Sequence, residues 1–216
     1  MLIQHIGHAE FLIETENGIK IVTDPYDASC GYPLHRITAD IALVSHYHHD
    51  HDAVENLQGN PLIIDSTGSY VPAADVRITA VNGWHDDTGG SKRGKTLLFL
   101  AETEGLRIVH LGDLGCQLNE EQLDILMEPD VLMIPVGGFF TIDAEQAKNT
   151  AVQLGAKIIL PMHYKTEYIS DWPISGPEDF LGMFEGKEIS LNAEALRVTK
   201  EDLECQPKVV LFQQEP

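Results

Sequence analysis

Short apolar segments recur along the chain and predict a structure built mainly from β-strands. The segments are rich in Ile, Val and Leu and are bounded by Gly, Asp, Asn or Pro, as is typical of strands. Several lack a strict alternation of apolar and polar positions, which favours sheets that are covered on both faces. We therefore expect strands at residues 2–6, 11–14, 19–23, 41–45, 62–64, 76–81, 96–101, 107–110, 131–135, 157–160 and 209–212.

Helix signals are fewer and lie mostly in the second half of the chain. Asp143 and Gln146 fit a capping box and Gly155 is a typical stop, so a helix is predicted over 144–154. Related signals predict helices at 52–57, 120–127 and 178–184. The combination of predicted strands and helices indicates the α/β class. Because no linker-like stretch divides the chain, we expect one domain over residues 1–216.

The composition narrows the functional classes. Lys and Arg number 14 and Asp and Glu 34, giving a formal net charge of −20, which repels nucleic-acid backbones and anionic membranes. Three cysteines without a CxxC motif argue against a disulfide framework and for a reducing compartment. The first residues lack a signal-peptide pattern, and no apolar run approaches the roughly 18 residues of a membrane span. We expect a cytoplasmic protein whose partner is a small-molecule substrate.

The strongest chemical signal is the segment SHYHHDHD at residues 45–52, directly after an apolar strand. Imidazole and carboxylate groups are good zinc ligands. His46 and His48, two residues apart beyond the strand, can turn to one side and bind one ion, and Asp50 and His51 can face a second. The alternative is a solvated histidine-rich turn.

Other His and Asp residues follow the ends of predicted strands, namely Asp24, His85, Asp113 and His163. Loops from several strands converge at such a rim, and the sites of α/β proteins assemble there. Each residue also has an ordinary alternative, since an aspartate can cap a turn and a histidine can bond to backbone. Long loops at 24–40, 82–94 and 136–143 are further candidates for function.

In their order along the chain, these residues resemble the pattern of the metallo-β-lactamase superfamily. The matching residues are Asp24, the HxHxDH motif at 46–51, His85, Gly112-Asp113 and His163. More narrowly, the chain resembles the branch that includes ascorbate-6-phosphate lactonase and other small hydrolases. This narrower resemblance is carried by Ile6-Gly7-His8-Ala9, Thr23-Asp24-Pro25 and the segments 85–94, 110–115, 135–138 and 161–164.

The resemblance implies a four-layer αββα sandwich, with two mixed sheets, helices on the outer faces and metals at one edge. Three residues are assigned to a first divalent metal ion: His46, His48 and His85. Three are assigned to a second ion: Asp50, His51 and His163. Asp113 is expected to bridge the two ions, and Asp24 to accept a hydrogen bond from a ligand imidazole. Zinc suits such a site, while manganese and iron are compatible. The branch also implies a homo-oligomer.

The roles of several nearby residues stay open in the sequence. His110 lies on a predicted strand, so a structural role or support of a ligand is favoured over ligation. His8 fits a place near the site and local hydrogen bonding equally well. Arg93 could bind an anionic group, and Tyr164 and Lys165 could reach substrate, but solvated or structural side chains are the alternative.

The expected chemistry is metal-assisted hydrolysis, in which two cations share a bridging water and give hydroxide near neutral pH. Asp50 and Asp113 are the expected catalytic carboxylates. The favoured interpretation is cleavage of a lactone or ester of a small metabolite, with or without a phosphate. A phosphodiesterase acting on a small phosphodiester is the alternative. A non-catalytic metal-binding module is disfavoured because all the ligands of the pattern are present.

Overall fold

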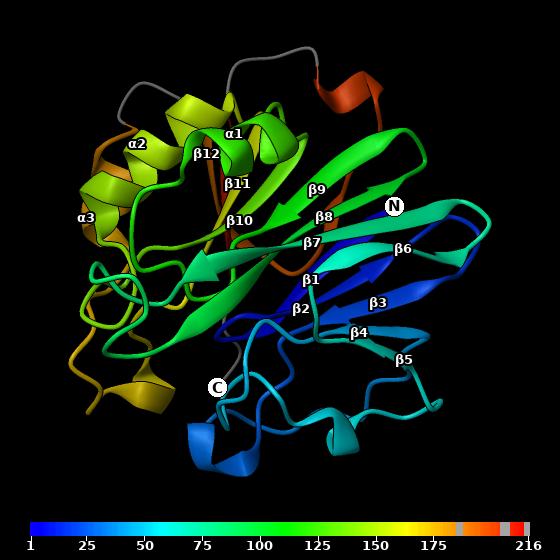
Figure 1. Ribbon diagram of the computed structural model, residues 1–216, viewed down its shortest axis with the longest axis horizontal. Coiled ribbons are helices and arrows are strands. Elements are labelled where there is room, and N and C mark those ends of the chain that lie inside the picture. Colours follow the sequence, from blue (N-terminus) through cyan, green and yellow to red (C-terminus); the bar gives the residue numbers. More distant parts are fainter. Residues whose placement is uncertain (185–187, 204–207, 214–216) are drawn as a thin grey trace.

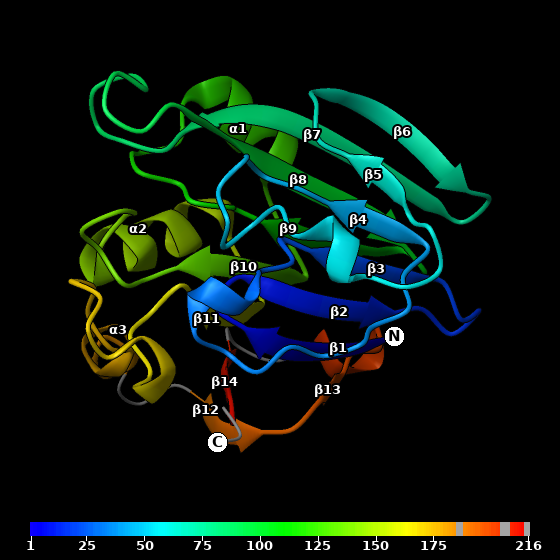
Figure 2. The same cartoon turned by 90° about the horizontal axis from the view of Figure 1, so that it is seen from below.

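Two β-sheets stacked face to face form the body of the protein. The computed structural model describes residues 1–184, 188–203 and 208–213. The smaller sheet has the order β13-β1-β2-β3-β4-β5. Its strands are β1 (Leu2–Gly7), β2 (Glu10–Glu14), β3 (Lys20–Thr23), β4 (Ile41–Leu43), β5 (Leu62–Ile64) and β13 (Leu196–Arg197). The blue-to-cyan strands β1–β4 lie against the green strands β7–β9 in Figures 1 and 2.

The larger sheet has the order β12-β14-β11-β10-β9-β8-β7-β6. Its strands are β6 (Gly68–Ala73), β7 (Val76–Trp84), β8 (Lys95–Thr103), β9 (Leu106–His110), β10 (Val131–Pro135), β11 (Ile158–Met162), β12 (Glu188–Ala193) and β14 (Lys208–Phe212). Both sheets are mixed, because β3, β4 and β5 are parallel beside an antiparallel β1–β3 unit, and β9, β10 and β11 are parallel beside an antiparallel β6–β9 unit. The predicted α/β sandwich of two mixed sheets is confirmed.

The main core lies between the two sheets. Inward-facing side chains such as Phe11, Ile21, Phe99 and Leu160 are almost fully buried there. Their removal from water is the main stabilising contribution to the sandwich. The same core takes side chains from both ends of the chain, from Met1 to Phe212, which supports our proposal of one domain.

Three α-helices cover the outer face of the larger sheet: α1 (Glu120–Leu126), α2 (Ala144–Leu154) and α3 (Glu178–Gly182). Figure 1 shows them together on the side of that sheet away from β1–β5. A loop covers the outer face of the smaller sheet, where Val22 packs against Ile37 and Ala39. This cover is thinner than the helices on the larger sheet. Two 3₁₀ helices, η1 (Ala28–Cys30) and η2 (Val54–Asn56), lie in the loops that follow β3 and β4.

Local sequence signals account for the helices. Both α1 and α2 begin with a complete capping box, at Asn119 and Asp143 respectively, and Gly155 ends α2 in the left-handed conformation. The helix predicted at 52–57 is only a 3₁₀ turn, and α3 is shorter than predicted. Three strands were not predicted: β6, an edge strand that contains a glycine and a proline, β12, and β13, which has two residues.

The carboxyl ends of β3, β4, β7, β9 and β11 point to one rim of the sandwich, since β7 runs antiparallel to β8 and β8 antiparallel to β9. The His and Asp residues predicted beyond these ends are therefore brought together. Among the described residues, no helix is long and apolar enough to cross a membrane.

Candidate metal centre

The loop that carries the HxHxDH motif is tied to the neighbouring strand by Asp24. This carboxylate, directly after β3, accepts hydrogen bonds from Ser45 N at 2.7 Å and from Ser45 Oγ at 2.8 Å. Its Oδ2 also lies 3.0 Å from His51 Nδ1. Burial raises the pKa of Asp24, but the charge of His51 outweighs burial and lowers it overall. Asp24 therefore holds His51 with its Nε2 available for another partner, as the sequence analysis expected of it.

One group of potential ligands consists of His46, His48 and His85. Each offers a ring nitrogen, and these nitrogens lie within 4.8 Å of one another. Ser45 Oγ lies 2.9 Å from His46 Nδ1 and so orients that ring. Burial, followed by the nearby charge of His51, lowers the pKa of His46 to about 3, so this imidazole is neutral and able to bind a cation near pH 7.

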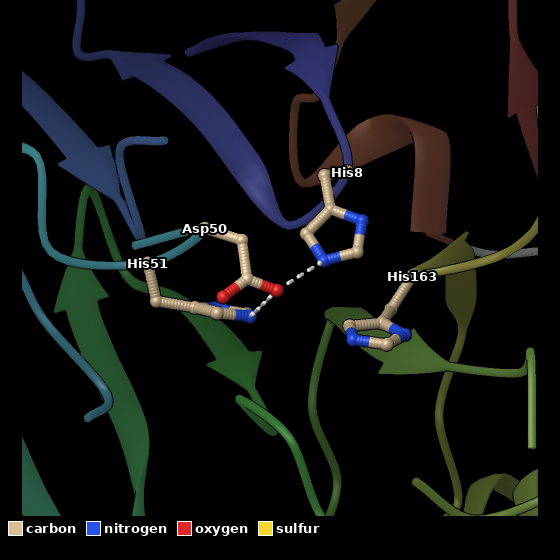
Figure 3. Close-up of side chains that lie close together, drawn as sticks. All are labelled: His8, Asp50, His51 and His163. Carbon is tan, nitrogen blue, oxygen red and sulfur yellow. Dashed lines mark ion pairs between the residues drawn. The ribbon is translucent and has the colours of Figure 1, made fainter. Parts of the chain in front are cut away.

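A second group lies beside the first and consists of His8, Asp50, His51 and His163, whose donor atoms also lie within 4.8 Å of one another. Figure 3 shows the three rings around the Asp50 carboxylate. Asp50 Oδ2 is 3.2 Å from His8 Nε2 and 3.5 Å from His51 Nε2. The structure therefore resolves the open question about His8 in favour of a place in the site. The sequence feature that pointed to His8 is its position just after a predicted strand, and the other site residues also follow predicted strands.

Asp113 lies between the two groups. Its Oδ2 is 3.2 Å from His85 Nε2 of the first group and 3.2 Å from His163 Nε2 of the second. Its Oδ1 is 3.3 Å from His51 Nε2. Burial raises the pKa of the carboxyl, yet His163 and His51 outweigh burial and hold the pKa well below its usual range. A charged carboxylate between two sets of imidazoles is the arrangement that a bridging ligand needs.

The polar atoms of this cluster are incompletely satisfied by the protein. His51 Nε2 and Asp113 Oδ1 are buried and lie 3.3 Å apart as an ion pair, yet neither forms a hydrogen bond with the described residues. Burying such atoms without hydrogen bonds is costly, and a coordinated cation would reduce that cost. The residues present therefore fit divalent metal ions.

Three of the seven non-glycine residues that have a positive φ in the described part of the chain lie at this centre. His8, Asp24 and His163 have φ angles of 51°, 40° and 51°, in the left-handed region that non-glycine residues rarely adopt. Such conformations cost free energy and cluster at functional sites, where the surrounding structure enforces them. The strain gives independent support for including His8 and His163 in the centre.

The centre opens into a cavity of about 560 Å³. The walls away from the centre include Arg93, Phe140, Trp172 and the exposed Asp171. The ring of His8 lies 5.3 Å from that of Trp172 between centroids, so the wall adjoins the centre. A second cavity, of about 660 Å³, lies at the other ends of β7 and β8 and has no histidine among its described lining residues.

Three residues near the centre have other positions or roles. His110 donates from Nε2 to Ala9 O at 3.1 Å and accepts at Nδ1 from Gly112 N at 3.1 Å, so both nitrogens serve the fold. Tyr164 is buried in the core beneath the helices. Neither Tyr164 nor Lys165 is among the described residues that line the cavity, which favours the structural or solvated alternative for both.

Asp86, which was not predicted as a site residue, organises the loop after His85. Its carboxylate accepts hydrogen bonds from backbone N–H groups of Thr88, Gly90, Lys92 and Arg93. An aspartate followed by Thr and Gly residues is a typical turn former, and that local signal could have marked it.

Two sheets with a buried His and Asp cluster at one rim define a class of metal-binding sandwich proteins. The family described as Beta-lactamase superfamily domain matches residues 2–163 of the chain. The crystal structure of a metallo-β-lactamase superfamily protein from Thermotoga maritima is 36% identical, with a TM-score of 0.82 over 98% of both chains.

The sequences of related proteins align with this chain over most of their length. A UPF0173 metal-dependent hydrolase from Archaeoglobus fulgidus is 26% identical over 227 residues, covering 91% of this chain and 96% of the relative. Another from Pelotomaculum thermopropionicum is 31% identical over 206 residues, covering 81% and 86%. The chain belongs to the metallo-β-lactamase superfamily and is one of its metal-dependent hydrolases.

Proposed function

We propose that the centre holds two divalent metal ions and hydrolyses an ester or lactone of a small metabolite. The first ion is held by His46, His48 and His85. The second is held by Asp50, His51 and His163, with His8 beside them. The observation that carries this proposal is the position of Asp113, within 3.3 Å of ring nitrogens from both groups. Zinc suits this set of ligands, and manganese and iron remain compatible.

The protein side chains orient the reacting groups and handle protons. Bound divalent ions supply Lewis acidity and lower the pKa of coordinated water. Asp113 positions the attacking water from its place between the histidine groups. Asp50 Oδ2 accepts the proton released during attack, and His8 Nε2, 3.2 Å away, holds that carboxylate in place. Trp172 and Phe140 cover the apolar part of the substrate and exclude bulk water from the cavity.

Cleavage of a small phosphodiester is the second candidate, supported by the cationic Arg93 on the cavity wall. A cavity of about 560 Å³ suits a small molecule, and the net charge of −20 disfavours long nucleic acids. We also propose a cytoplasmic setting, consistent with the free thiols of Cys30 and Cys116. Cys205 lies outside the described residues. A homo-oligomer remains a prediction from the resemblance.

The proposal is tested by assaying one panel of small lactones, p-nitrophenyl esters and bis-p-nitrophenyl phosphate with the metal-loaded protein. Preferred turnover of a lactone or ester, lost on chelation and restored by one of the three metals, is the expected result. Preferred turnover of the phosphodiester would select the second candidate. Stoichiometric metal binding without turnover of any panel member would contradict both.

A further inference from the structure

Arg93 is the cation of the cavity wall, and no carboxylate of the described chain forms an ion pair with it. It is the one Lys or Arg among the described residues that line the cavity. Lys92 is paired with Asp87 at 2.9 Å and Arg107 with Glu102 at 3.1 Å. Arg93 differs from these side chains because it lines the cavity beside the candidate centre and has no such partner among the described residues.

Two aromatic rings hold the Arg93 guanidinium. Its Cζ lies 5.9 Å from the centroid of Phe139 and 5.4 Å from that of Phe140. Aromatic contacts of this kind stabilise the cation through its planar face. They leave the N–H groups at its edge free to donate, which is the geometry that binds a carboxylate or phosphate.

The loop fixes Arg93 relative to the metal centre. Arg93 N donates to Asp86 Oδ2 at 2.8 Å, and Lys92 N donates to the same oxygen at 2.9 Å. His85 N donates to Gly94 O at 3.1 Å and closes the base of the loop. Asp86 thereby sets the spacing between His85, a candidate metal ligand, and Arg93 on the same cavity.

We propose that Arg93 binds an oxyanionic group of the substrate, a carboxylate or a phosphate, while the scissile bond lies at the His and Asp centre. The inference rests on the proposed hydrolysis and adds its substrate class: a small ester or lactone with one negatively charged end. Phe140 and Trp172, whose ring centroids are 6.1 Å apart, contact the apolar part between the two ends. Arg93 places a positive charge at the end of the cavity where such a group would lie.

A matched set of acetyl esters tests this inference: neutral phenyl acetate, 4-acetoxybenzoate with a carboxylate, and 4-acetoxyphenyl phosphate. The variants are Arg93→Ala and Arg93→Lys. The control is Lys92→Ala, which removes a neighbouring exposed cation that does not line the cavity. Metal content is measured for every variant, so that loss of metal is not mistaken for loss of substrate binding.

The expected result is a selective loss of activity on charged esters. Arg93→Ala should lower kcat/KM for at least one anionic ester by about 10- to 100-fold while changing phenyl acetate by less than about threefold. Arg93→Lys should retain part of the preference, because it keeps the charge but loses the paired donors. The more affected ester distinguishes carboxylate from phosphate. Equal losses on neutral and anionic esters, no loss in Arg93→Ala, or the same loss in Lys92→Ala would overturn the inference.

A binding measurement separates this inference from the proposed activity. Benzoate, phenyl phosphate and neutral phenol are titrated calorimetrically into wild type and Arg93→Ala at matched metal content. Weaker binding of an anion, and not of phenol, by Arg93→Ala would support the anion site even if no ester were turned over. In that case the proposed hydrolysis would fail and the anion site would stand. Equal anion affinity in both proteins would contradict the anion site whatever the activity.

Discussion

Asp24 Oδ2 lies 3.0 Å from His51 Nδ1, and both side chains are fully buried. Because the same carboxylate also binds Ser45, it joins the end of β3 to the metal-binding loop after β4. The contact fixes the tautomer of His51 and keeps its Nε2 directed at Asp113, 3.3 Å away. Asp24 is thus a positioning residue of the centre and does not itself contact the proposed ions.

Replacing Asp24 by Asn should weaken metal binding by about 10- to 100-fold, the range seen when partners of metal-bound histidines are lost. The amide keeps the size of the side chain but lacks the charge that supports His51. Competition with a chelator of known affinity measures the change. The control is Asp87→Asn, an exposed carboxylate paired with Lys92. Unchanged metal affinity in Asp24→Asn would contradict the assigned role.

His8 and His110 should respond differently to replacement. His8→Asn keeps a side chain that tolerates the φ of 51°, so it should fold, yet it removes the ring beside Asp50 and should lower turnover at least tenfold. His110→Ala loses two buried hydrogen bonds and should lower the free energy of unfolding by about 1–3 kcal/mol while retaining metal. Metal analysis, activity and denaturant unfolding of both variants check the contrast. Loss of metal from His110→Ala with normal stability would contradict the structural role of His110 and indicate a role in metal binding.

Glu10 should make stability depend on pH. Burial raises its pKa from 4.5 to about 8, partly opposed by a hydrogen bond from the Tyr26 backbone. The folded state thus keeps a proton that the unfolded chain loses above its lower pKa. Between these values stability should fall by about 1.4 kcal/mol per pH unit as pH rises, and the effect should level off above the folded pKa.

The Glu10→Gln variant should remove this contribution, since a neutral amide can also accept the Tyr26 N–H. Its stability gain over wild type should be small near pH 5 and largest near pH 8 by this linkage, in urea denaturation at several pH values. Glu14→Gln, a half-buried position on the same strand, is the control. A gain for Glu10→Gln that is the same at all pH values would be inconsistent with a buried protonated carboxyl.

Cys30 should be chemically inert in the folded protein. Its side chain is 1% exposed, and burial followed by the charge of Asp50 raises its pKa to about 12. Because the thiolate is the reactive form, iodoacetamide near neutral pH should modify Cys30 only after denaturation. Peptide mass spectrometry of the folded and denatured protein gives the answer. Rapid labelling of folded Cys30 with loss of activity would point to a thiol in the reaction and against hydrolysis by the metal centre alone.

The sequence singled out most of the residues that the structure brings together at the candidate centre, because their signals are local and ordered. Each candidate ligand follows the end of an apolar strand, and parallel strands bring their carboxyl ends to one rim. The capping boxes at Asn119 and Asp143 are likewise complete within four residues, so α1 and α2 could be placed closely.

What the sequence left open or missed depends on contacts between distant segments, on side-chain direction or on weak local patterns. The role of His8 stayed open because its contact with Asp50 spans 42 positions of the chain. Tyr164 and His163 are adjacent, yet one enters the core beneath the helices and the other faces the centre. The Asp86 turn was hidden in a polar loop, and β6 lacks the apolar pattern of an inner strand because it lies at a sheet edge.

Asp113 is proposed to join two metal-binding groups in one hydrolytic centre. Metal content and esterase activity of wild type, His46→Ala and Asp113→Ala, each purified without chelator, test this role. We expect about two equivalents of metal and turnover that chelation abolishes in wild type, with reduced metal and no turnover in both variants. Full activity in either variant, or no metal and no turnover in wild type supplied with zinc, manganese or iron, would contradict a shared hydrolytic centre.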